Sequence, residues 1–299
     1  MFRRCFAVGI AIAAMVILMT LPGRAVAQTE GIVDRIAEMG AEVDWTDMEI
    51  IVRGIGAPPT NVSPAQRRPM AIRAAKADAL RNLLEVTKGV DVSSETTVES
   101  AIVTSDIIRT KVSGLVQGAR VDRTKYMSDG SVEVYLKMLM DGELMDVVIP
   151  DNDWKVPKPP EPVSTGGGTP PPPPPPPPKP PEVKPGEPTG LIVDCRGLKV
   201  KAALAPNILS DTGENLYGTE FLSEEVGDKD GIVWYCKSLD QAKANKDKVG
   251  SNPMIVRAVK AQGKNMCDVV VPKDAADKLK AIGKDVSFLD ECNVAFVID

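Results

Sequence analysis

Residues 70–89 have the sequence MAIRAAKADALRNLLEVTKG and carry a long helical pattern. Apolar residues recur there at spacings of three, four and seven, which predicts a helix over Met70–Lys88 with one buried stripe. The stripe consists of Ile72, Ala79, Leu80, Leu83 and Val86. Gly89 is expected to end the helix, because glycine is common just past a helix C-terminus. We expect this helix to organise the first half of the chain.

Positive charge is concentrated on this helix and just before it, in the candidate docking residues Arg67, Arg68, Arg73, Lys76 and Arg81. Such a cluster could meet an acidic partner or anionic lipid headgroups. The five residues do not share one helical face, so ordinary solvated charges are the alternative interpretation. Lys76 is expected in the apolar sector, and Arg81 is expected to pair with Glu85 one turn later.

Strand patterns flank the helix. Glu49–Arg53 predicts a strand that ends in Gly54-Ile55-Gly56, which lacks the further residues of a phosphate loop. After the helix, the patterns predict a strand, a second helix and a hairpin around Asp129-Gly130, over residues 90–98, 99–112, 115–127 and 131–140. This order predicts an α+β unit with two helices packed on one face of a small sheet.

These same residues resemble a bacterial envelope family. Residues 71–85 resemble its helix A-x-R-A-A-x-x-D-A-x-R-x-L, and residues 114–119 and 129–134 resemble its strands G-x-V-x-G-A and D-G-x-V-x-V. The family includes the Lpp-twenty-type lipoproteins and the N-terminal domain of flagellar assembly protein T. The resemblance covers most of residues 45–148 and implies an α/β domain used in envelope assembly rather than catalysis. Because no lipobox is present, the lipid anchor of the lipoprotein members is not expected.

A proline-rich stretch divides the chain. It contains nine consecutive prolines, Pro170–Pro178. Proline excludes helix and sheet interior, so we expect a polyproline II spacer. The predicted organisation is therefore a leader at residues 1–27, an envelope-assembly-like domain at 28–150, a linker at 151–188 and a second small mixed α/β domain at 189–299.

The C-terminal part alternates short strands with short helices. Strands are predicted over residues 190–195, 231–236, 253–259, 268–271 and 293–298, with a hairpin around Asp211–Gly213 and helices from Leu239 and over Lys273–Ile282. The segments TGLIVDCRGL, DTGENLYG and FLDECNVAFVID resemble the tail domain of uncharacterised exported proteins. That resemblance implies no activity.

Four cysteines lie in this last part, at Cys195, Cys236, Cys267 and Cys292. An even number of cysteines in an exported domain favours disulfides, with three connectivities open. One disulfide or buried thiols are the alternatives, because cysteine can also serve as a small core hydrophobe. No two of these cysteines have the close spacing of a zinc clip.

The first 27 residues have the pattern of a secretory signal peptide. Arg3 and Arg4 precede an apolar stretch, and Ala25-Val26-Ala27 forms an A-x-A cleavage pattern. The apolar run is shorter than the roughly 20 residues that span a bilayer. We expect Sec-type cleavage after Ala27 and a periplasmic or secreted protein with no later membrane span.

Composition excludes several functions. The chain has no histidine, so triads and zinc sites that depend on histidine are excluded. Its net charge of −5 and the lack of a basic run argue against nucleic-acid binding. No catalytic, cofactor-binding or metal-ligating set of residues is expected.

We therefore expect an exported, non-enzymatic envelope protein that acts by protein–protein contact, with two binding domains held apart by a stiff spacer. The expected partners are cell-envelope proteins, including a flagellar or outer-membrane assembly. The alternative is a periplasmic small-molecule-binding protein, or a carboxylate-dependent hydrolase with Asp194 and Arg196 near its site.

Overall fold

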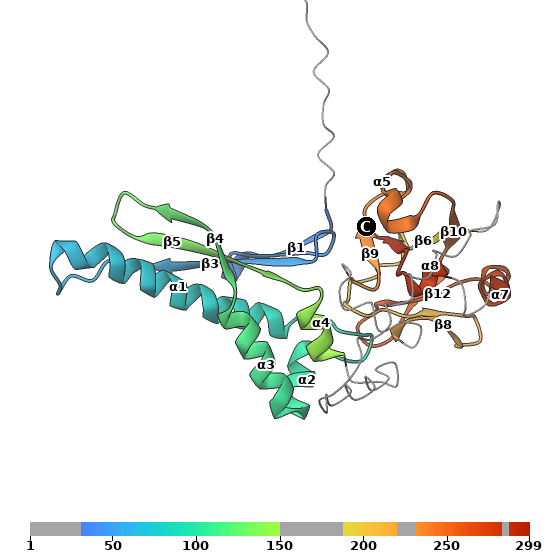
Figure 1. Ribbon diagram of the computed structural model, residues 1–299, viewed down its shortest axis with the longest axis horizontal. Helices are drawn as coiled ribbons and strands as arrows, with labels where there is room; N and C mark the ends of the chain where they lie inside the picture. Colours follow the sequence, from blue (N-terminus) through green and yellow to red (C-terminus); the bar gives the residue numbers. More distant parts are fainter. Residues whose placement is uncertain (1–30, 150–187, 220–230, 283–286) are drawn as a thin grey trace, which may run out of the picture.

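The computed structural model describes residues 31–149, 188–219, 231–282 and 287–299, and these form a mixed α+β fold as predicted (Figure 1). The predicted leader and residues 151–187 of the predicted linker lie outside the described residues. We refer below to residues 31–149 as the N-terminal segment and to the described residues from 188 onward as the C-terminal segment.

The N-terminal segment contains one antiparallel sheet with the strand order β1-β2-β3-β5-β4. The strands are β1 (Val33–Ile36), β2 (Ala41–Asp44), β3 (Glu49–Gly56), β4 (Arg120–Tyr126) and β5 (Val132–Leu139). The predicted hairpin is confirmed, with Val132, Val134, Leu136 and Met138 buried on one face of β5. Its first strand begins at Arg120 and not at Leu115 as predicted, because residues 115–117 continue the preceding helix. Strands β1 and β2, joined by the 3-10 turn Ala37–Met39, were not predicted because four-residue strands carry little alternation.

Helix α1 (Pro64–Lys88) packs across β3 and β5. It begins six residues before the predicted start, with Pro64 in its first turn, where the missing N–H costs nothing. The backbone N–H of Ser63 donates to Gln66 Oε1 at 3.4 Å. Pro69 lies inside the helix. The first turns of α1 extend beyond the sheet (Figure 1).

Two glycines of β3 allow this helix to approach the strand closely. A Cβ atom on Gly54 would lie 2.2 Å from the backbone nitrogen of Ala79, and one on Gly56 would lie 2.0 Å from the backbone oxygen of Ala71. The facing positions of α1, at Ala71, Ala75 and Ala79, are fully buried. The Gly-x-Gly pattern therefore serves strand–helix packing, since any side chain there would separate the two elements.

The buried face of α1 is rotated from the predicted one. Ala79, Leu83 and Val86 are buried as expected, but Ile72 and Leu80 are only half-buried. Asp78 and Asn82 bind β3: Asp78 Oδ2 accepts from the Ile55 N–H at 2.9 Å, and Asn82 Nδ2 donates to the Arg53 carbonyl at 2.8 Å. These bonds satisfy β3 backbone groups beyond the end of its pairing with β2.

The predicted second helix is two helices, α2 (Val98–Thr104) and α3 (Asp106–Gln117). Ser105 between them has extended backbone angles and caps α3, because its Oγ accepts from the Ile108 N–H at 3.4 Å. Both helices pack against α1, and α3 also contacts α4 (Glu143–Val148). Two helices were expected on one face of the sheet. Instead, α1 packs on the sheet, and α2 and α3 pack beside α1.

The C-terminal segment has a parallel sheet with the order β10-β6-β13-β9. Its strands β6 (Gly190–Asp194), β9 (Trp234–Cys236), β10 (Pro253–Arg257) and β13 (Val294–Val297) were all predicted. Short helices α5 (Leu239–Ala244) and α6 (Lys246–Val249) contact this sheet, and Ala242 and Val249 share an apolar cluster with Ile192 and Val297.

A second sheet has the order β11-β12-β7-β8. Strands β7 (Ile208–Leu209) and β8 (Asn215–Tyr217) form the predicted hairpin, in which Gly213 has a φ of +83°. Strand β12 (Asp268–Val270) was predicted, whereas β11 (Lys260–Gln262) was not. Helix α7 (Lys273–Ile282) has its predicted bounds, and α8 (Ser287–Asp290) precedes the last strand.

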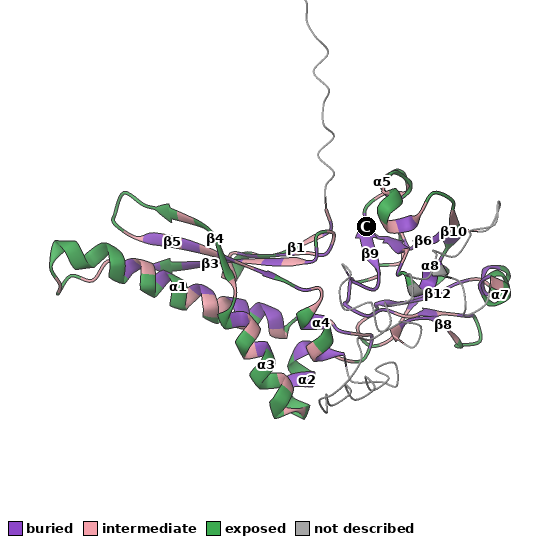
Figure 2. Cartoon of the chain, in the orientation of Figure 1, coloured by how far each residue is buried: buried purple, intermediate pink, exposed green. Residues whose placement is uncertain are grey.

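The two segments are in contact, although the sequence predicts units held apart by a rod. One continuous cluster of buried apolar residues includes Trp45 and Val90 from the N-terminal segment and Tyr235 and Ile298 from the C-terminal segment. The buried residues coloured in Figure 2 lie inside both segments and where they meet. This shared core joins the two segments into one packed body.

Candidate functional site

Aromatic packing joins the segments. The Trp45 ring, which follows β2, lies edge-on to Tyr235 of β9, with the ring centroids 6.0 Å apart. Tyr235 in turn lies edge-on to Phe296 of β13, also at 6.0 Å. The Thr46 hydroxyl donates to the Tyr235 carbonyl at 3.0 Å. Edge-to-face rings add to the apolar area they bury, so this stack stabilises the contact.

The loop after α1 supplies most of the backbone contacts. The sequence predicts a strand over residues 90–98, but only an isolated bridge between Asp91 and Thr97 forms there among the described residues. The carbonyls of Asp91 and Val92 instead accept from the N–H groups of Leu204 and Ala205, at 3.0 and 2.7 Å. The Ser94 carbonyl accepts from the Asn265 N–H at 2.9 Å. The strand prediction is therefore wrong, because these backbone groups bind the C-terminal segment.

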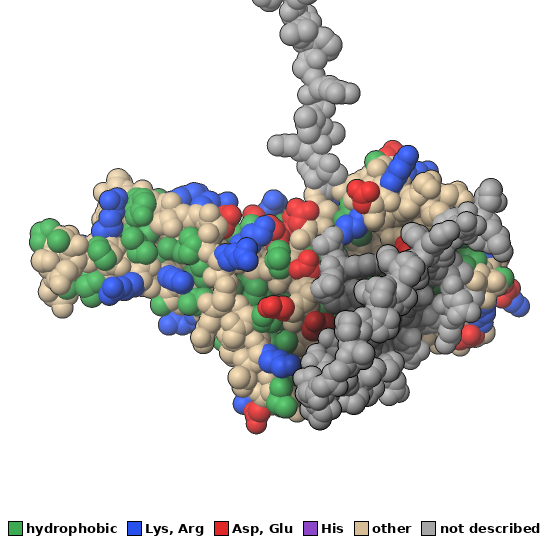
Figure 3. Space-filling view, in the orientation of Figure 1, with side chains coloured by type: hydrophobic (Ala, Val, Ile, Leu, Met, Phe, Trp, Pro, Cys, Tyr) green, Lys and Arg blue, Asp and Glu red, His purple; other side chains and the backbone are tan. Residues whose placement is uncertain are grey.

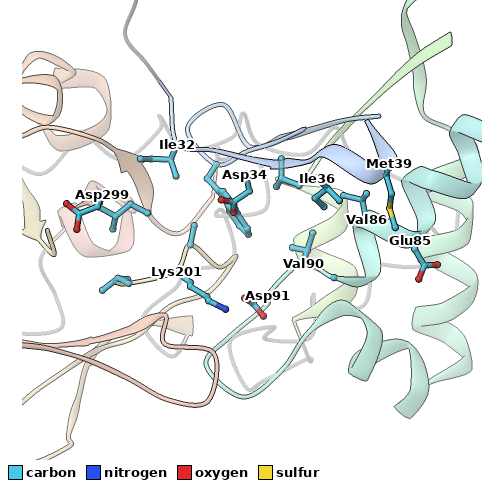
Figure 4. A pocket seen from close by; sticks show the side chains of 16 residues that line it. Ile32, Asp34, Ile36, Met39, Glu85, Val86, Val90, Asp91, Lys201 and Asp299 are labelled. Carbon is cyan, nitrogen blue, oxygen red and sulfur yellow. The ribbon is translucent and has the colours of Figure 1, made fainter. Parts of the chain in front are cut away.

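A pocket of about 370 Å³ opens beside this contact (Figure 4). Strand β1 and the end of α1 form one wall, and residues 200–202 and 298–299 form the other. Trp45 and Val90 are among its apolar lining residues. The volume is at the lower end of the range for small-ligand sites, about 300–1,000 Å³.

Charged side chains from separate stretches surround this pocket. Asp34, Asp91 and Lys201 come from β1, the loop after α1 and the stretch after β6, and Figure 4 shows all three around the cavity. Burial raises the pKa of the Asp91 carboxyl; Lys201 opposes that shift and Asp34 adds to it. Asp34 Oδ2 accepts from Trp45 Nε1 at 2.9 Å. Glu85 and Asp299 also line the pocket, so its charge is mainly negative.

Asp194 and Arg196, the residues of the alternative hydrolase site, do lie together. Arg196 binds Asp194 through Nε and Nη2 at 2.8 and 2.9 Å, and Arg257 Nη1 binds the same carboxylate at 3.0 Å. The hydrogen bonds from Arg196 hold the pKa of the buried Asp194 carboxyl below its ordinary value. Neither residue lines the pocket. A carboxylate held by two guanidinium groups anchors the end of β6 and is poorly suited to proton transfer.

The four candidate disulfide cysteines are all buried. Cys195, Cys236 and Cys267 are thiols in this structure. Buried thiols were one of the alternatives to disulfides that the sequence left open. Cys195 follows β6 and Cys236 ends β9, and β13 lies between these two strands. Burial raises the pKa of Cys236 and of Cys267 to about 12, so neither is a reactive thiolate. Cys292 precedes β13 at the far end of that sheet.

The five candidate docking residues all lie on α1 and are all exposed. Lys76 is not in the apolar sector as expected but reaches solvent. Arg81 lies 3.7 Å from Asp78, and Glu85 pairs with Lys88 at 3.6 Å, so the predicted Arg81–Glu85 pair does not form. The Arg68 guanidinium lies 4.3 Å from the centre of the Tyr126 ring.

The described residues contain no cluster of three or more acidic or cysteine side chains arranged to hold a metal ion. No described helix is long and apolar enough to cross a membrane.

Comparison with known proteins bears on the C-terminal segment. Residues 190–299 match the family described as Treponema pallidum Tp0624, second domain. The match, which we call the Tp0624-like region, begins at the first residue of β6 and includes both sheets of the C-terminal segment. No curated protein matches the chain. The resemblance of the N-terminal segment to the envelope family stays a prediction.

Sequence reasoning did not find the pocket. The charged residues that line the pocket are far apart in the sequence and belong to no motif. Of these residues, only Lys201 and Asp299 lie in the Tp0624-like region. Trp45 was a usable signal, because a tryptophan in a chain with so few aromatic residues is often an anchor at a contact.

Proposed function

We propose that this chain is an exported, non-enzymatic protein of the cell envelope that acts by contact with other envelope proteins. The observation that best supports this proposal is the set of five basic residues on α1, all of which reach solvent. Arg67, Arg73 and Lys76 form no ion pair with any described residue, so their charge is available to a partner. The signal-like leader and the envelope-family resemblance support the compartment and the partner class, a flagellar or outer-membrane assembly.

The arrangement of the segments supports a revised form of the expected mechanism. Because the two segments share a buried core, they would present their surfaces to partners as one body and not as two modules on a rod. Docking to a rigid body loses less conformational entropy than docking to two tethered modules.

Site-specific photo-crosslinking in the producing cells tests this proposal. A photoreactive residue at Arg73 or Lys76 on α1 is expected to capture discrete envelope proteins. The same residue at Asp277, an exposed position on α7, is the control. Identical products from α1 and α7, or none from α1, would contradict the contact function.

The pocket between the segments favours one second candidate, a periplasmic small-molecule-binding protein or a carboxylate-dependent hydrolase. Its mainly negative lining would select a cationic group attached to an apolar body. A hydrolase would use Asp91, with its raised pKa, as the general acid beside Asp34.

A thermal-shift screen separates the two candidates. A small amine or ester that raises the melting temperature of the native chain, but not that of Asp91→Asn, would favour the pocket function. Crosslinks from α1 without any such ligand would favour the contact function.

A further inference from the structure

Three elements meet at the end of the N-terminal segment that lies farthest from the C-terminal segment (Figure 1). They are the first turns of α1, the end of β3 and the β4–β5 hairpin. The pairing of Gly56 with Val132, and of Val132 with Tyr126, places β3 beside the hairpin. The contact between Arg68 and Tyr126 at 4.3 Å places α1 beside it as well. We call this region the distal tip and define it by its exposed residues Ile55, Arg67, Arg68, Met70, Lys125, Tyr126 and Met127.

Large apolar side chains are exposed at the distal tip. Tyr126 is 53% exposed, Ile55 49%, Met127 46% and Met70 41%. Single exposed apolar residues are ordinary on protein surfaces, but these four come from three elements that converge at one protruding end. Figure 3 shows hydrophobic side chains at this end with Lys and Arg side chains close by.

The charge of the distal tip is positive in a chain whose net charge is −5. Arg67, Arg68 and Lys125 are exposed, and the first turn of α1 has no acidic residue. Cations at a helix N-terminus oppose the helix dipole, so this sequence places positive charge where the helix itself disfavours it. The exposed carboxylate of Asp129 at the hairpin turn accepts from the N–H and hydroxyl of Ser131, at 2.9 and 2.6 Å, which keeps it ionised, so it offsets one of the three positive charges and leaves the tip with a net positive charge.

We propose that the distal tip binds the surface of a lipid bilayer rich in anionic headgroups. Arg67 and Arg68 would contact the phosphates, and Lys125, whose ammonium group donates to the Tyr135 hydroxyl at 3.3 Å, would add to the local positive charge. Met70, Tyr126 and Met127 would enter the boundary between headgroups and acyl chains. Tyrosine is favoured at that depth because its ring is apolar and its hydroxyl is polar. A protruding end that mixes apolar and cationic side chains fits a deformable anionic surface better than the hollow of a protein partner. This goes beyond the proposed contact with envelope proteins and does not depend on it.

Vesicle co-sedimentation tests the proposal with the chain from Gln28 to Asp299, which contains every described residue. The apolar leader is left out because it would enter bilayers by itself. The vesicles contain either phosphatidylglycerol and phosphatidylcholine in equal parts or phosphatidylcholine alone. The chain is expected to bind the mixed vesicles, to bind pure phosphatidylcholine at least tenfold more weakly, and to lose affinity as salt is raised.

Two triple variants and a control locate the binding surface. The variant Arg67→Glu, Arg68→Glu, Lys125→Glu is expected to lose affinity tenfold or more, since each cation near an anionic surface contributes about fivefold. The variant Met70→Ser, Tyr126→Ser, Met127→Ser is expected to weaken binding at high salt as well as low. The control Lys243→Glu, Lys246→Glu, Lys260→Glu makes the same change in net charge at exposed positions of the C-terminal segment and is expected to bind normally. Circular dichroism checks that each variant keeps its fold.

Three outcomes would overturn the proposal: no binding to the mixed vesicles, equal binding to both vesicle types, or an equal loss in the control variant. If vesicle binding is absent while the variant Arg67→Glu, Arg68→Glu, Lys125→Glu loses the α1 crosslinks in cells, the distal tip docks an acidic protein instead. If vesicle binding is present but the crosslinks are absent, the protein-contact function fails and the lipid proposal stands.

Discussion

At the scale of single residues, Gly54 is a position where the structure has no room for a side chain. A methyl group there would lie 2.2 Å from the Ala79 nitrogen and 2.3 Å from the Ala75 oxygen, both backbone atoms that cannot rotate away. We expect Gly54→Ala to destabilise the fold by about 3 kcal/mol, because β3 and α1 must separate. Urea unfolding followed by circular dichroism measures this.

Gly114 in α3 is the matched control, because nothing lies within 4 Å of the position its Cβ would take. Gly114→Ala is expected to raise stability by about 1 kcal/mol through helix propensity alone. If both substitutions had equal effects, close packing would not be the reason for Gly54.

Asp194 is a buried carboxylate paired with two arginines, Arg196 and Arg257. Its carboxyl pKa is lowered on folding, so the arginine contacts stabilise the fold at pH values above about 4 and lose that contribution as the pH falls through the folded pKa. We expect Asp194→Asn to cost about 2 kcal/mol at pH 7, because Arg196 and Arg257 lose their shared partner.

The cost should shrink at pH 3, because the carboxyl of the unfolded chain is then largely protonated and folding must remove that proton to form the arginine contacts. Urea denaturation at both pH values measures the difference, and Asp247→Asn on the exposed face of α6 serves as control. A cost for Asp194→Asn that is the same at pH 3 and pH 7 would show that the charge of Asp194 is not what stabilises the end of β6.

At the scale of elements, α1 and β3 are held by side-chain bonds as well as by packing. Asp78→Ala is expected to lower stability by about 1 kcal/mol and to speed hydrogen exchange at the Ile55 amide, which loses its acceptor. Arg81→Ala is the control on the same helix, since Arg81 is exposed and its ion pair with Asp78 is long, at 3.7 Å. Exchange at Ile55 that responds equally to both substitutions would argue against this bond.

The sequence predicts elements well where local pattern and final environment agree. The bounds of α7 follow from its amphipathic period, and the strands of the parallel sheet follow from continuous apolar runs. Prediction from the sequence fails where a contact between residues distant in sequence determines the local structure. Residues 90–98 alternate as a strand does, but the C-terminal segment takes their backbone bonds. The helix over 99–112 divides because Ser105 can cap as well as continue a helix.

The candidate site was harder to predict than the fold. Asp194 and Arg196 are close in sequence and meet as their spacing implies. The pocket could not be predicted, because Asp34, Asp91 and Lys201 come together only when the segments pack. The candidate docking residues were predicted from charge alone, and their exposure depends on how α1 is rotated against β3.

At the scale of the whole molecule, the contact between the segments should outlast a cut between them. We expect a chain with a protease site inserted at Gly166–Gly168 to elute as one species after cleavage, because the segments share a buried core. Size-exclusion chromatography measures this. Gly263→Val should separate the fragments, since its Cβ would lie 2.2 Å from the Ser94 Cβ.

Gly213→Val is the control for that separation, because Gly213 has a similar positive φ but nothing within 4 Å of its added Cβ. Fragments of the unsubstituted chain that elute apart would show that the contact forms only when the linker joins the segments.

The place of β13 between β6 and β9 has a consequence for how the chain matures. This strand is made after β6, β9 and β10, and yet it inserts into the middle of their sheet. Until Val294–Val297 emerges from the ribosome, β6 and β9 have no neighbour between them and their apolar edges stay open. The parallel sheet therefore cannot form strand by strand during synthesis, and a nascent chain stalled before Val294 would remain a substrate for chaperones and proteases.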